Sequence, residues 1–426
     1  MPELGATEGE LWGRPIVALC CSKMHSTMQE LARLLLDGSV ICLPLPPEAD
    51  SARQLDTVLG RIQKAAETSD VDVRRIWSRI DLITGTSGTT TGTGKLVGLT
   101  AAALTTSARA TWQYLLEGSS ERTATWVLAL PAHHIAGLQV VFRAATGTHL
   151  GVRLTESNLE ILGTDDFLPD FIKTTKRAQS STQTLFTSLV PTQLHRVLSD
   201  EAATQAAAAY TRILVGGGPT DPNLLDRARN AGLNVATTYG ASETAGGCFY
   251  DGRPIPSDPP PAAHISEDGT VGLTTPTLFE GYLSGETGPI RTDHGLMWQT
   301  KDLAHLDDGR LVIDGRSDRV IISGGIKVFP QQVEQSLRDL GAEHALVVGM
   351  PSEEWGQRVC ALATLPKGVA VPTLDHAREY VRNALGAAAA PARILWVDEI
   401  PTQGISKPDY QRAQQMLTDA GYELTE

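Results

Sequence analysis

Residues 184–198 read TLFTSLVPTQLHRVL, a short β-prone run that leads through a proline into a helical pattern. The alternation of β-prone and helical runs continues along the chain. Arg212–Val215 is β-prone, Asn223–Ala231 has helical spacing, and Val235–Thr238 is β-prone again. Upstream, Thr125–Leu130 is another β-prone run. Strands that alternate with helices predict a layered α/β domain whose strands are largely parallel.

Residues 1–80 carry a different pattern. Thr27–Leu36 and Ala52–Ala66 place apolar residues at helical spacing, and Ser39–Leu45 is a short β-prone run that ends at prolines. These patterns predict a mainly helical segment that contains one strand.

The pattern changes again near Asp314. Arg310–Asp314 and Arg319–Ile322 are short β-prone runs. Beyond them, helical and β-prone patterns alternate at Pro330–Leu340, Ala345–Gly349, Cys360–Leu365, Leu374–Leu385 and Ile394–Val397. A segment of roughly 110 residues is large enough to form its own domain. We therefore predict a large layered α/β domain with mixed or parallel sheets over residues 1–314 and a small α+β domain over residues 315–426.

With 41% hydrophobic and 20% charged residues, the 426-residue chain has the composition of a soluble globular protein with more than one core. Its net charge of −13 argues against nucleic acid or an anionic membrane as the partner. No apolar run reaches the roughly 20 residues that span a bilayer, and Met1–Glu10 is unlike a secretory signal. We therefore expect a cytoplasmic protein whose five cysteines form neither disulfides nor a zinc site.

A loop rich in glycine and threonine, TSGTTTGTGK, occupies Thr86–Lys95. Glycines let backbone amides approach an anion, hydroxyls add donors and the lysine adds charge, so the composition suits a triphosphate. It is not a Walker loop, because Thr89 and Leu96 stand where that motif needs a glycine and a hydroxyl. A flexible linker is the alternative. The β-type residues Asp81–Ile83 before the loop favour a phosphate site that follows a strand.

Three further places carry suitable chemistry. Thr237–Thr244 reads TTYGASET, in which a tyrosine could pack on a purine and adjacent Ser and Glu suit phosphate and Mg²⁺. The alternative is an ordinary turn with a capping Ser and a surface Glu. Asp302 is placed to accept ribose hydroxyls. Lys407, in a polar loop, would on its own be an ordinary solvated lysine.

Taken in order, these segments resemble the adenylate-forming superfamily of acyl-CoA synthetases, adenylation domains and luciferases. The resemblance extends from about residue 80 to the end of the chain. The family patterns are a phosphate loop, Tyr-Gly-x-Thr-Glu, Thr-Gly-Asp, the hinge Gly-Arg-x-Asp and a closing Pro-x-x-x-x-Gly-Lys. They are matched in turn by Thr86–Lys95, Tyr239–Glu243, Thr300–Asp302, Gly315–Asp318 and Pro401–Lys407.

The resemblance implies ATP, Mg²⁺ and CoA as ligands, and a small domain that turns about Asp318. Lys407 would bridge the carboxylate and the α-phosphate, Glu243 would hold Mg²⁺, and Asp302 with Arg316 would grip the ribose. Gly324 and Gly325 would line the path of the pantetheine arm. The nucleotide-binding residues implied are Thr86, Ser87, Gly88, Thr89, Thr90, Thr91, Gly92, Lys95, Gly217, Gly218, Tyr239, Gly240, Ser242, Asp302 and Arg316.

The chain departs from the family pattern in four places. The phosphate loop has one residue more than the pattern, and Gly94 replaces its proline. Lys301 and Ser406 each replace a glycine. The last two changes remove no functional group, so the sequence still predicts an active enzyme.

Three finer segments resemble the o-succinylbenzoate–CoA ligases of menaquinone biosynthesis: Leu130–Leu138, Thr187–Leu194 and Tyr239–Gly252. Such a substrate has two carboxylates, so the acyl pocket should offer a cation or polar donors to the one that is not activated. The candidates are His134, Arg143, Thr192, Gln193 and His195. His134 is also counted as catalytic with Lys407 and Glu243, and its alternative is a core histidine packed beside His133.

Other functions remain open at this point. One is a ligase for another aryl or medium-chain acid, and a second is an adenylation module that loads a carrier protein. A third is a protein that binds an adenylate without catalysis. The retention of Lys407, Glu243, Asp302 and Arg316 together argues against the third. A homodimer is also left open.

Overall fold

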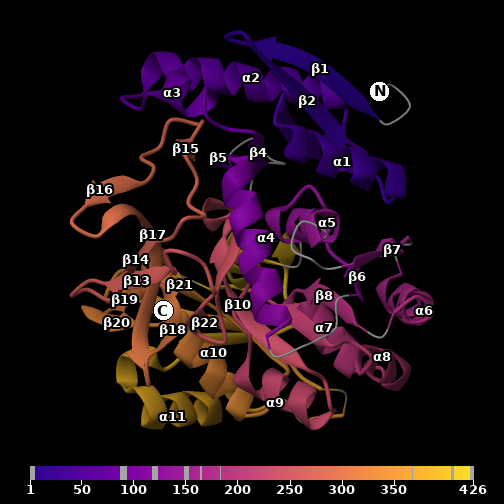
Figure 1. The fold of residues 1–426 in the computed structure, drawn as a ribbon. Coiled ribbons are helices and arrows are strands. Elements are labelled where there is room, and N and C mark those ends of the chain that lie inside the picture. The colour runs from indigo at the N-terminus through magenta and orange to yellow at the C-terminus, as the bar shows by residue number, and fades with distance from the viewer. Residues whose placement is uncertain are drawn as a thin grey trace. The chain divides into compact units, whose positions relative to one another are not determined.

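The computed structural model describes residues 5–86, 94–117, 123–147, 153–163, 166–182, 184–366, 368–403 and 407–422 (Figure 1). The chain divides into two compact units. The first comprises Met1–His264 with Gly272–Gln299, and the second comprises Ile265–Val271 with Thr300–Glu426. Gly315, where the sequence places the start of the small domain, lies inside the second unit.

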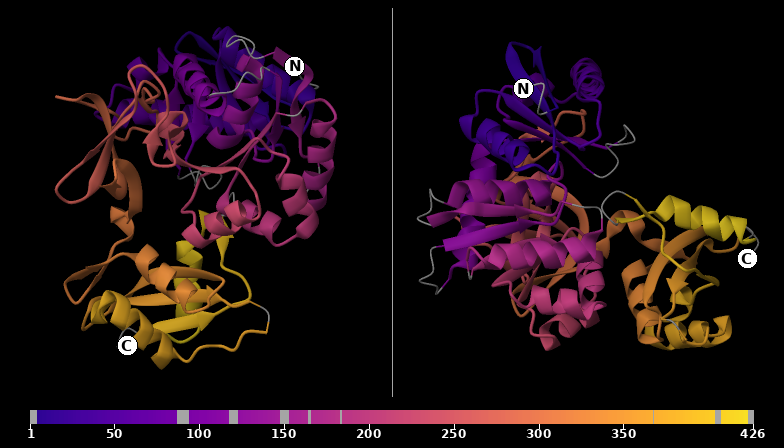
Figure 2. Two further views of the ribbon diagram at one scale, coloured as in Figure 1. Left: turned by 60° about the horizontal axis from the view of Figure 1, so that its bottom comes forward. Right: turned by 90° about the vertical axis from the view of Figure 1, so that its right-hand side faces the viewer.

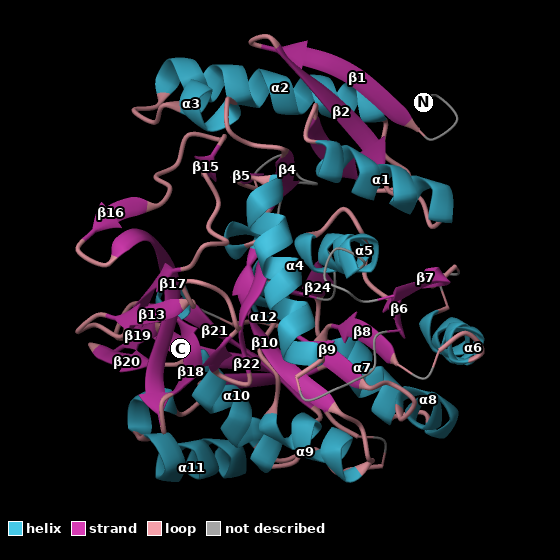
Figure 3. Ribbon diagram, viewed as in Figure 1, coloured by secondary structure: helices cyan, strands magenta, loops and turns pink. Residues whose placement is uncertain are grey.

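The first unit begins with a six-stranded sheet in the order β1-β2-β3-β4-β5-β15. Its strands are β1 (Ala6–Leu11), β2 (Arg14–Cys20), β3 (Ile41–Leu45), β4 (Leu82–Gly85), β5 (Leu96–Leu99) and β15 (Gly281–Tyr282). Because side chains alternate across a strand, Val17 and Leu19 join one core while Ile16 and Ala18 join the other. The second of these cores is completed by α2 (Ser51–Thr68) and α3 (Val73–Trp77) (Figure 3). The first includes α1 (His25–Asp37) and α4 (Ala101–Leu115).

The prediction of a single strand before residue 80 is wrong, because β1 and β2 form an antiparallel hairpin ahead of α1. The turn is tight: Trp12 has φ 48° and Gly13 has φ 76°. β1 reads ATEGEL, and its mostly polar side chains suit an edge strand with one face in solvent. The two predicted helices and the strand at Ser39–Leu45 are confirmed as α1, α2 and β3.

A seven-stranded sheet in the order β12-β11-β10-β9-β8-β6-β7 forms the rest of the first unit's core. Strands β7, β6, β8, β9 and β10 run parallel, as predicted, whereas β11 and β12 are antiparallel additions at one edge. The strands are β6 (Thr123–Leu128), β7 (Arg153–Ile161), β8 (Leu185–Leu189), β9 (Arg212–Val215), β10 (Val235–Ala241), β11 (Gly246–Tyr250) and β12 (Arg253–Pro254). The helices are α5 (Ile135–Thr146), α6 (Phe167–Gln179), α7 (Pro191–Leu198), α8 (Glu201–Ala207) and α9 (Pro222–Asn230).

The chain from residue 262 to 316 adds five further strands, and only the last of them overlaps a predicted β-prone run, Arg310–Asp314. These are β13 (Ala262–Ile265), β14 (Thr270–Thr274), β16 (Ile290–Thr292), β17 (Gly295–Asp307) and β18 (Arg310–Arg316). The boundary between the two units falls within β13, β14 and β17. In the second unit the end of β17 pairs with β18, which sets Asp302 opposite Arg316.

The second unit contains a mixed sheet in the order β20-β19-β22-β21, with β23 beside β22. Helices α10 (Pro330–Asp339) and α11 (Leu374–Leu385) pack on one face and α12 (Tyr410–Asp419) on the other (Figure 2). This is the α+β arrangement predicted from the sequence. The strands are β19 (Ile321–Ser323), β20 (Ile326–Val328), β21 (His344–Ser352), β22 (Gly356–Thr364) and β23 (Arg393–Trp396), with a separate hairpin of β24 (Thr402–Gln403) and β25 (Lys407–Pro408).

All five cysteines are buried free thiols. Among the described residues, no helix is both long and apolar enough to cross a membrane.

Candidate active site

The predicted phosphate loop connects two antiparallel strands of the first sheet, β4 and β5. Its ends are held together by Thr86 and Lys95: the Thr86 amide donates to the Lys95 carbonyl and the Lys95 amide to Thr86 Oγ1, both at 3.0 Å. Arg61 Nη2 donates to the carbonyl of Gly94 at 2.5 Å. The predicted phosphate ligands between these ends, Ser87, Gly88, Thr89, Thr90, Thr91 and Gly92, lie outside the described residues.

Glu243 lies in a short 3₁₀ turn, η4 (Ser242–Thr244), that directly follows β10. Its side chain is only 7% exposed, so the alternative of a surface glutamate is wrong. Two buried side chains hold the end of the turn: Ser107 Oγ and Gln139 Nε2 both donate to the carbonyl of Ala245, at 3.0 and 2.8 Å. The strand ahead needs glycine at position 240, where a Cβ would come within 2.1 Å of the Gly246 carbonyl oxygen.

Tyr282, which was not predicted from the sequence, connects Glu243 to Lys95 at the end of the predicted phosphate loop. Its hydroxyl donates to Glu243 Oε1 at 2.8 Å, and Lys95 Nζ lies 4.1 Å from the centre of its ring. Burial and the adjacent Glu243 carboxylate both raise the pKa of Tyr282, so the phenol stays protonated and remains a donor. Lys95, Tyr282 and Glu243 therefore form one cluster in the first unit.

The remaining nucleotide candidates of the first unit lie where neighbouring parallel strands end. Tyr239, Gly240 and Ser242 follow one another at the end of β10, and Gly217 and Gly218 follow β9. β9 and β10 pair in parallel, so these segments meet at the same edge of the sheet. The carboxyl ends of parallel strands are the usual place for a ligand in an α/β sheet.

His134 is the residue before α5, and its ring lies 4.3 Å from that of His133. Burial lowers the pKa of His133 to about 4, and its Nδ1 is buried without a hydrogen-bond partner in the described structure. His133 is thus neutral at physiological pH, and both histidines are partly buried.

Arg143 is a cation in the core of the first unit. It is 4% exposed, and its contacts are the Tyr250 hydroxyl at 3.4 Å and the Trp126 ring at 5.4 Å. No carboxylate of the described residues pairs with it, its Nε has no partner there, and burial lowers its pKa. An arginine buried without an acid is costly unless something else compensates its charge.

The other acyl-pocket candidates lie on α7. Gln193 uses both ends of its amide locally: Oε1 accepts from the Val190 amide at 3.1 Å and Nε2 donates to the Ala129 carbonyl at 2.9 Å. Thr192 is exposed and His195 is partly buried. The structure therefore separates the candidates into two groups, one at α5 with the buried Arg143 and the partly buried His134, and a second on α7.

In the second unit, Arg316 joins two acidic side chains. Its Nη1 donates to Asp302 Oδ1 at 3.2 Å, and its Nε and Nη2 donate to the two oxygens of Asp318, each at 3.0 Å. Lys301, which replaces a glycine of the family pattern, pairs with Asp318 at 3.3 Å. Burial alone would raise the pKa of Asp318, but the bonds from Arg316 and Lys301 outweigh it and lower the pKa.

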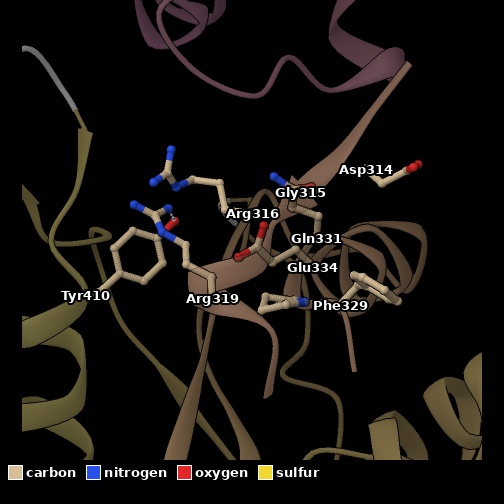
Figure 4. Close-up of a pocket in the computed structure, with 9 residues that line it drawn as sticks. Asp314, Gly315, Arg316, Arg319, Phe329, Gln331, Glu334 and Tyr410 are labelled. Atoms are coloured by element: carbon tan, nitrogen blue, oxygen red, sulfur yellow. Dashed lines mark hydrogen bonds between the residues drawn. The ribbon is translucent and has the colours of Figure 1, made fainter. Parts of the chain in front are cut away.

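A small cavity lies beside this cluster, within the second unit (Figure 4). Arg319 lies over the ring of Tyr410 at 3.7 Å and donates to its hydroxyl. Glu334 accepts from the Val347 amide at 3.0 Å, and burial raises its pKa. The cavity is lined by Asp314, Gly315, Arg316, Arg319, Phe329, Pro330, Gln331, Glu334 and Tyr410.

Two further predictions concern the second unit. Lys407 pairs with Gln403 through the backbone of β25, but its side chain and residue Ser406 lie outside the described structure. Gly324 has φ 57°, and a Cβ there would come within 2.6 Å of the Trp355 ring, so this position requires glycine. Gly325 also has a positive φ, 81°, and faces open space.

Two family models match the chain: AMP-binding enzyme over residues 79–288 and AMP-binding enzyme C-terminal domain over residues 336–407. A probable 2-succinylbenzoate–CoA ligase of Mycobacterium tuberculosis is 37% identical over 84% of this chain and 87% of the relative. A 2-succinylbenzoate–CoA ligase of Geobacillus kaustophilus is 30% identical over 66% of this chain and 59% of the relative. The chain therefore belongs to the family of AMP-binding, adenylate-forming enzymes, which confirms the resemblance read from its motifs.

Two solved structures also match the chain. The o-succinylbenzoate CoA synthetase of Bacillus subtilis, in complex with its acyl-adenylate intermediate, matches with a TM-score of 0.63 and 25% identity, over 78% of this chain and 69% of that chain. ATP-bound MatB of Rhodopseudomonas palustris matches with a TM-score of 0.75 and 19% identity, over 97% of this chain and 90% of that chain. The second likeness shows the fold alone, and together they confirm the predicted fold class.

Proposed function

We propose that this protein is an ATP-dependent acid–thiol ligase that forms an acyl-adenylate and then an acyl-CoA, with o-succinylbenzoate as the acid. The observation that carries the proposal is the contact of the buried Glu243, through Tyr282, with Lys95 at the end of the predicted phosphate loop. The names and identities of the relatives support the choice of acid.

The first step brings two anions together, since a carboxylate oxygen attacks the α-phosphate of ATP and pyrophosphate leaves. Positioning and positive charge must therefore carry the catalysis. The ammonium group of Lys95 places one positive charge at the loop that would receive the β- and γ-phosphates. Glu243 fits Mg²⁺, which commonly takes one or two carboxylates beside substrate phosphates and which, when bound, neutralises phosphate charge. Lys407 would bridge the attacking carboxylate and the α-phosphate.

The second step needs a changed site, because Lys407 must leave before the thiol of CoA can attack the acyl carbonyl and release AMP. We assign the movement to residues 315–426, turning about Asp318. The ion pairs of Asp318 with Arg316 and Lys301 support this, since both are partly exposed and can break and re-form at small cost. Gly324 and Gly325 would then leave room for the pantetheine arm.

We assign Arg143 to the carboxylate of o-succinylbenzoate that is not activated. The support is its burial without an acidic partner among the described residues, beside the polar hydroxyl of Tyr250. A substrate carboxylate would compensate this charge. Gln193, whose amide is bonded to the backbone at both ends, then holds the start of α7 in place next to the pocket.

The test is a steady-state assay of pyrophosphate and thioester with ATP, Mg²⁺, CoA and a panel of acids. We expect both products with o-succinylbenzoate, in an assay that fails when any component is omitted. Comparable turnover of simple benzoates or medium-chain acids would overturn the choice of acid. Pyrophosphate without thioester would indicate an adenylation module that loads another acceptor. Neither product from folded protein would favour a non-catalytic adenylate-binding protein.

We place this activity in the cytoplasm, where ATP and CoA are available. The five buried free thiols are consistent with a reducing compartment.

A further inference from the structure

We propose that Tyr282 is a positioning residue that fixes Glu243 as the ligand of Mg²⁺ and at the same time holds Lys95 at the phosphate loop. The inference rests on the proposed function, in which Glu243 and Lys95 serve the metal and the phosphates. Tyr282 itself would touch neither ATP nor the metal.

Two separate parts of the Tyr282 side chain make the two contacts. The hydroxyl donates to Glu243 Oε1 at 2.8 Å, and the ring face receives Lys95 Nζ at 4.1 Å from its centre. A carboxylate offers about four lone-pair sites, so one hydroxyl donor orients the group and still leaves it able to ligate a cation. The ring attracts the ammonium without neutralising it, so Lys95 keeps its charge for phosphate.

The tyrosine is itself rigidly held. Its side chain is 2% exposed, and its ring packs against that of Phe279 at 4.7 Å. β15, which carries it, pairs with β5, the strand that follows Lys95, so that Tyr282 is opposite Val97. The Phe279 amide donates to the carbonyl of Glu243 at 2.9 Å. Three segments far apart in the sequence are therefore tied together at this side chain.

A hydroxyl suits this role better than a second cation would. An arginine or lysine in the place of Tyr282 would pair with Glu243 and compete with Mg²⁺, and it would repel Lys95. The residues that orient a metal ligand typically change metal affinity by about 10–100-fold when they are replaced.

The alternative is that Tyr282 is only a core residue whose hydroxyl happens to be satisfied. Tyr210 provides the matched control. It is 3% exposed in the hydrophobic core that contains Phe171 and Val197, and its hydroxyl bonds to Thr175 at 2.8 Å and to no other residue that the structure describes. If Tyr282 were structural, Tyr282→Phe and Tyr210→Phe would lower the melting temperature alike and leave metal binding unchanged.

The experiment measures binding of Mn²⁺·ATP, without any acid, by electron paramagnetic resonance. We expect Tyr282→Phe to weaken binding by about tenfold or more, and Tyr210→Phe to leave it within about twofold of wild type. Adding Tyr282→Phe to Glu243→Gln should change binding by less than about twofold, because the tyrosine acts through a carboxylate that is no longer present. Tyr282→Phe that is folded and binds Mn²⁺·ATP like the wild type would overturn the inference.

Tyr282→His keeps a ring and an N–H donor, and it provides the test if Tyr282→Phe does not fold. Binding within about threefold of wild type would support the inference, and binding as weak as that of Glu243→Gln would overturn it. A different result would contradict the proposed function. Wild-type protein that binds Mn²⁺·ATP but releases no pyrophosphate with any acid would contradict the activity, while metal binding would still decide the role of Tyr282.

Discussion

Glu243 in the first unit is 7% exposed and accepts a hydrogen bond from a neutral tyrosine, whereas Asp318 in the second unit is 36% exposed and is paired with both Arg316 and Lys301. A buried ion pair carries a desolvation cost that its attraction does not always repay, so a hydroxyl is the less costly way to orient a buried carboxylate. An exposed ion pair in water is worth little and can exchange partners. The difference fits the two proposed roles, a fixed metal ligand at Glu243 and an adjustable set of charges at Asp318.

The largest effect is expected at the fixed carboxylate. Glu243→Gln keeps the size of the side chain and an acceptor for Tyr282 but removes the charge that would hold Mg²⁺. We expect pyrophosphate release to fall on the order of 10²–10³-fold with little change in melting temperature. Glu160→Gln is the control, because Glu160 is 6% exposed and pairs with Arg177 at 2.5 Å outside the cluster. Equal losses of activity in the two variants would contradict the account.

The second prediction concerns His133, a partly buried histidine of the same unit. Its pKa is about 4 in the folded protein and about 6.5 in an unfolded chain, so acid favours the unfolded chain as the pH falls from 6.5 towards 4. Between pH 7 and pH 5 this lowers the free energy of unfolding by about 2 kcal/mol. Urea unfolding at the two pH values should show a smaller difference for His133→Asn than for wild type. Identical pH dependence would show that burial does not shift this group.

At the proposed hinge, Arg316→Lys should separate the effect on ATP binding from the effect on stability. Lysine cannot form the bidentate pair with Asp318 and also bond to Asp302. Because Asp302 and Arg316 would bind the ribose together, we expect ATP to bind about tenfold more weakly. Because these pairs are partly exposed, the free energy of unfolding should change by less than about 1 kcal/mol. Arg229→Lys, which alters an exposed pair with Asp226 on α9, should change neither quantity and serves as the control. A large loss of stability in Arg316→Lys would mean that the cluster is a rigid anchor.

The smallest effect is expected at His305, an exposed histidine of the second unit. Asp314 accepts from its ring at 2.9 Å and raises its pKa, the opposite direction to that of His133. The stability from this pair is present below the unfolded pKa of about 6.5 and is lost as the pH rises through the higher folded value. Because the pair is exposed, His305→Asn should lower the free energy of unfolding at pH 6 by no more than about 0.5 kcal/mol, and added salt should remove the difference.

Local patterns in the sequence predicted only a part of the helices and strands that build the two units. Pro191–Leu198, Arg212–Val215 and Leu374–Leu385 match α7, β9 and α11 residue for residue, because each combines clear periodicity with a turn signal at its end. The strand β1 was missed because an edge strand with polar side chains lacks the apolar run by which buried strands are recognised.

The candidate site could be predicted only where its residues belong to motifs. Glu243, Asp302 and Arg316 were found in this way, and the ion pair of Arg316 with Asp302 follows from a strand pairing that the motifs did not contain. Tyr282 was missed because it lies 39 residues from Glu243, on a strand of two residues with no pattern of its own. Its place is set by long-range pairing with β5, which short-range periodicity cannot report.

The most direct test of the account is a single-turnover experiment with protein in excess over o-succinylbenzoate. ATP and Mg²⁺ are added first, the reaction is quenched and analysed by mass, and CoA is added to a parallel sample. The account predicts an acyl-adenylate, with one pyrophosphate for each, that accumulates without CoA and is then converted into thioester and AMP. Thioester formed without a preceding adenylate, or release of ADP and phosphate in place of AMP and pyrophosphate, would contradict it.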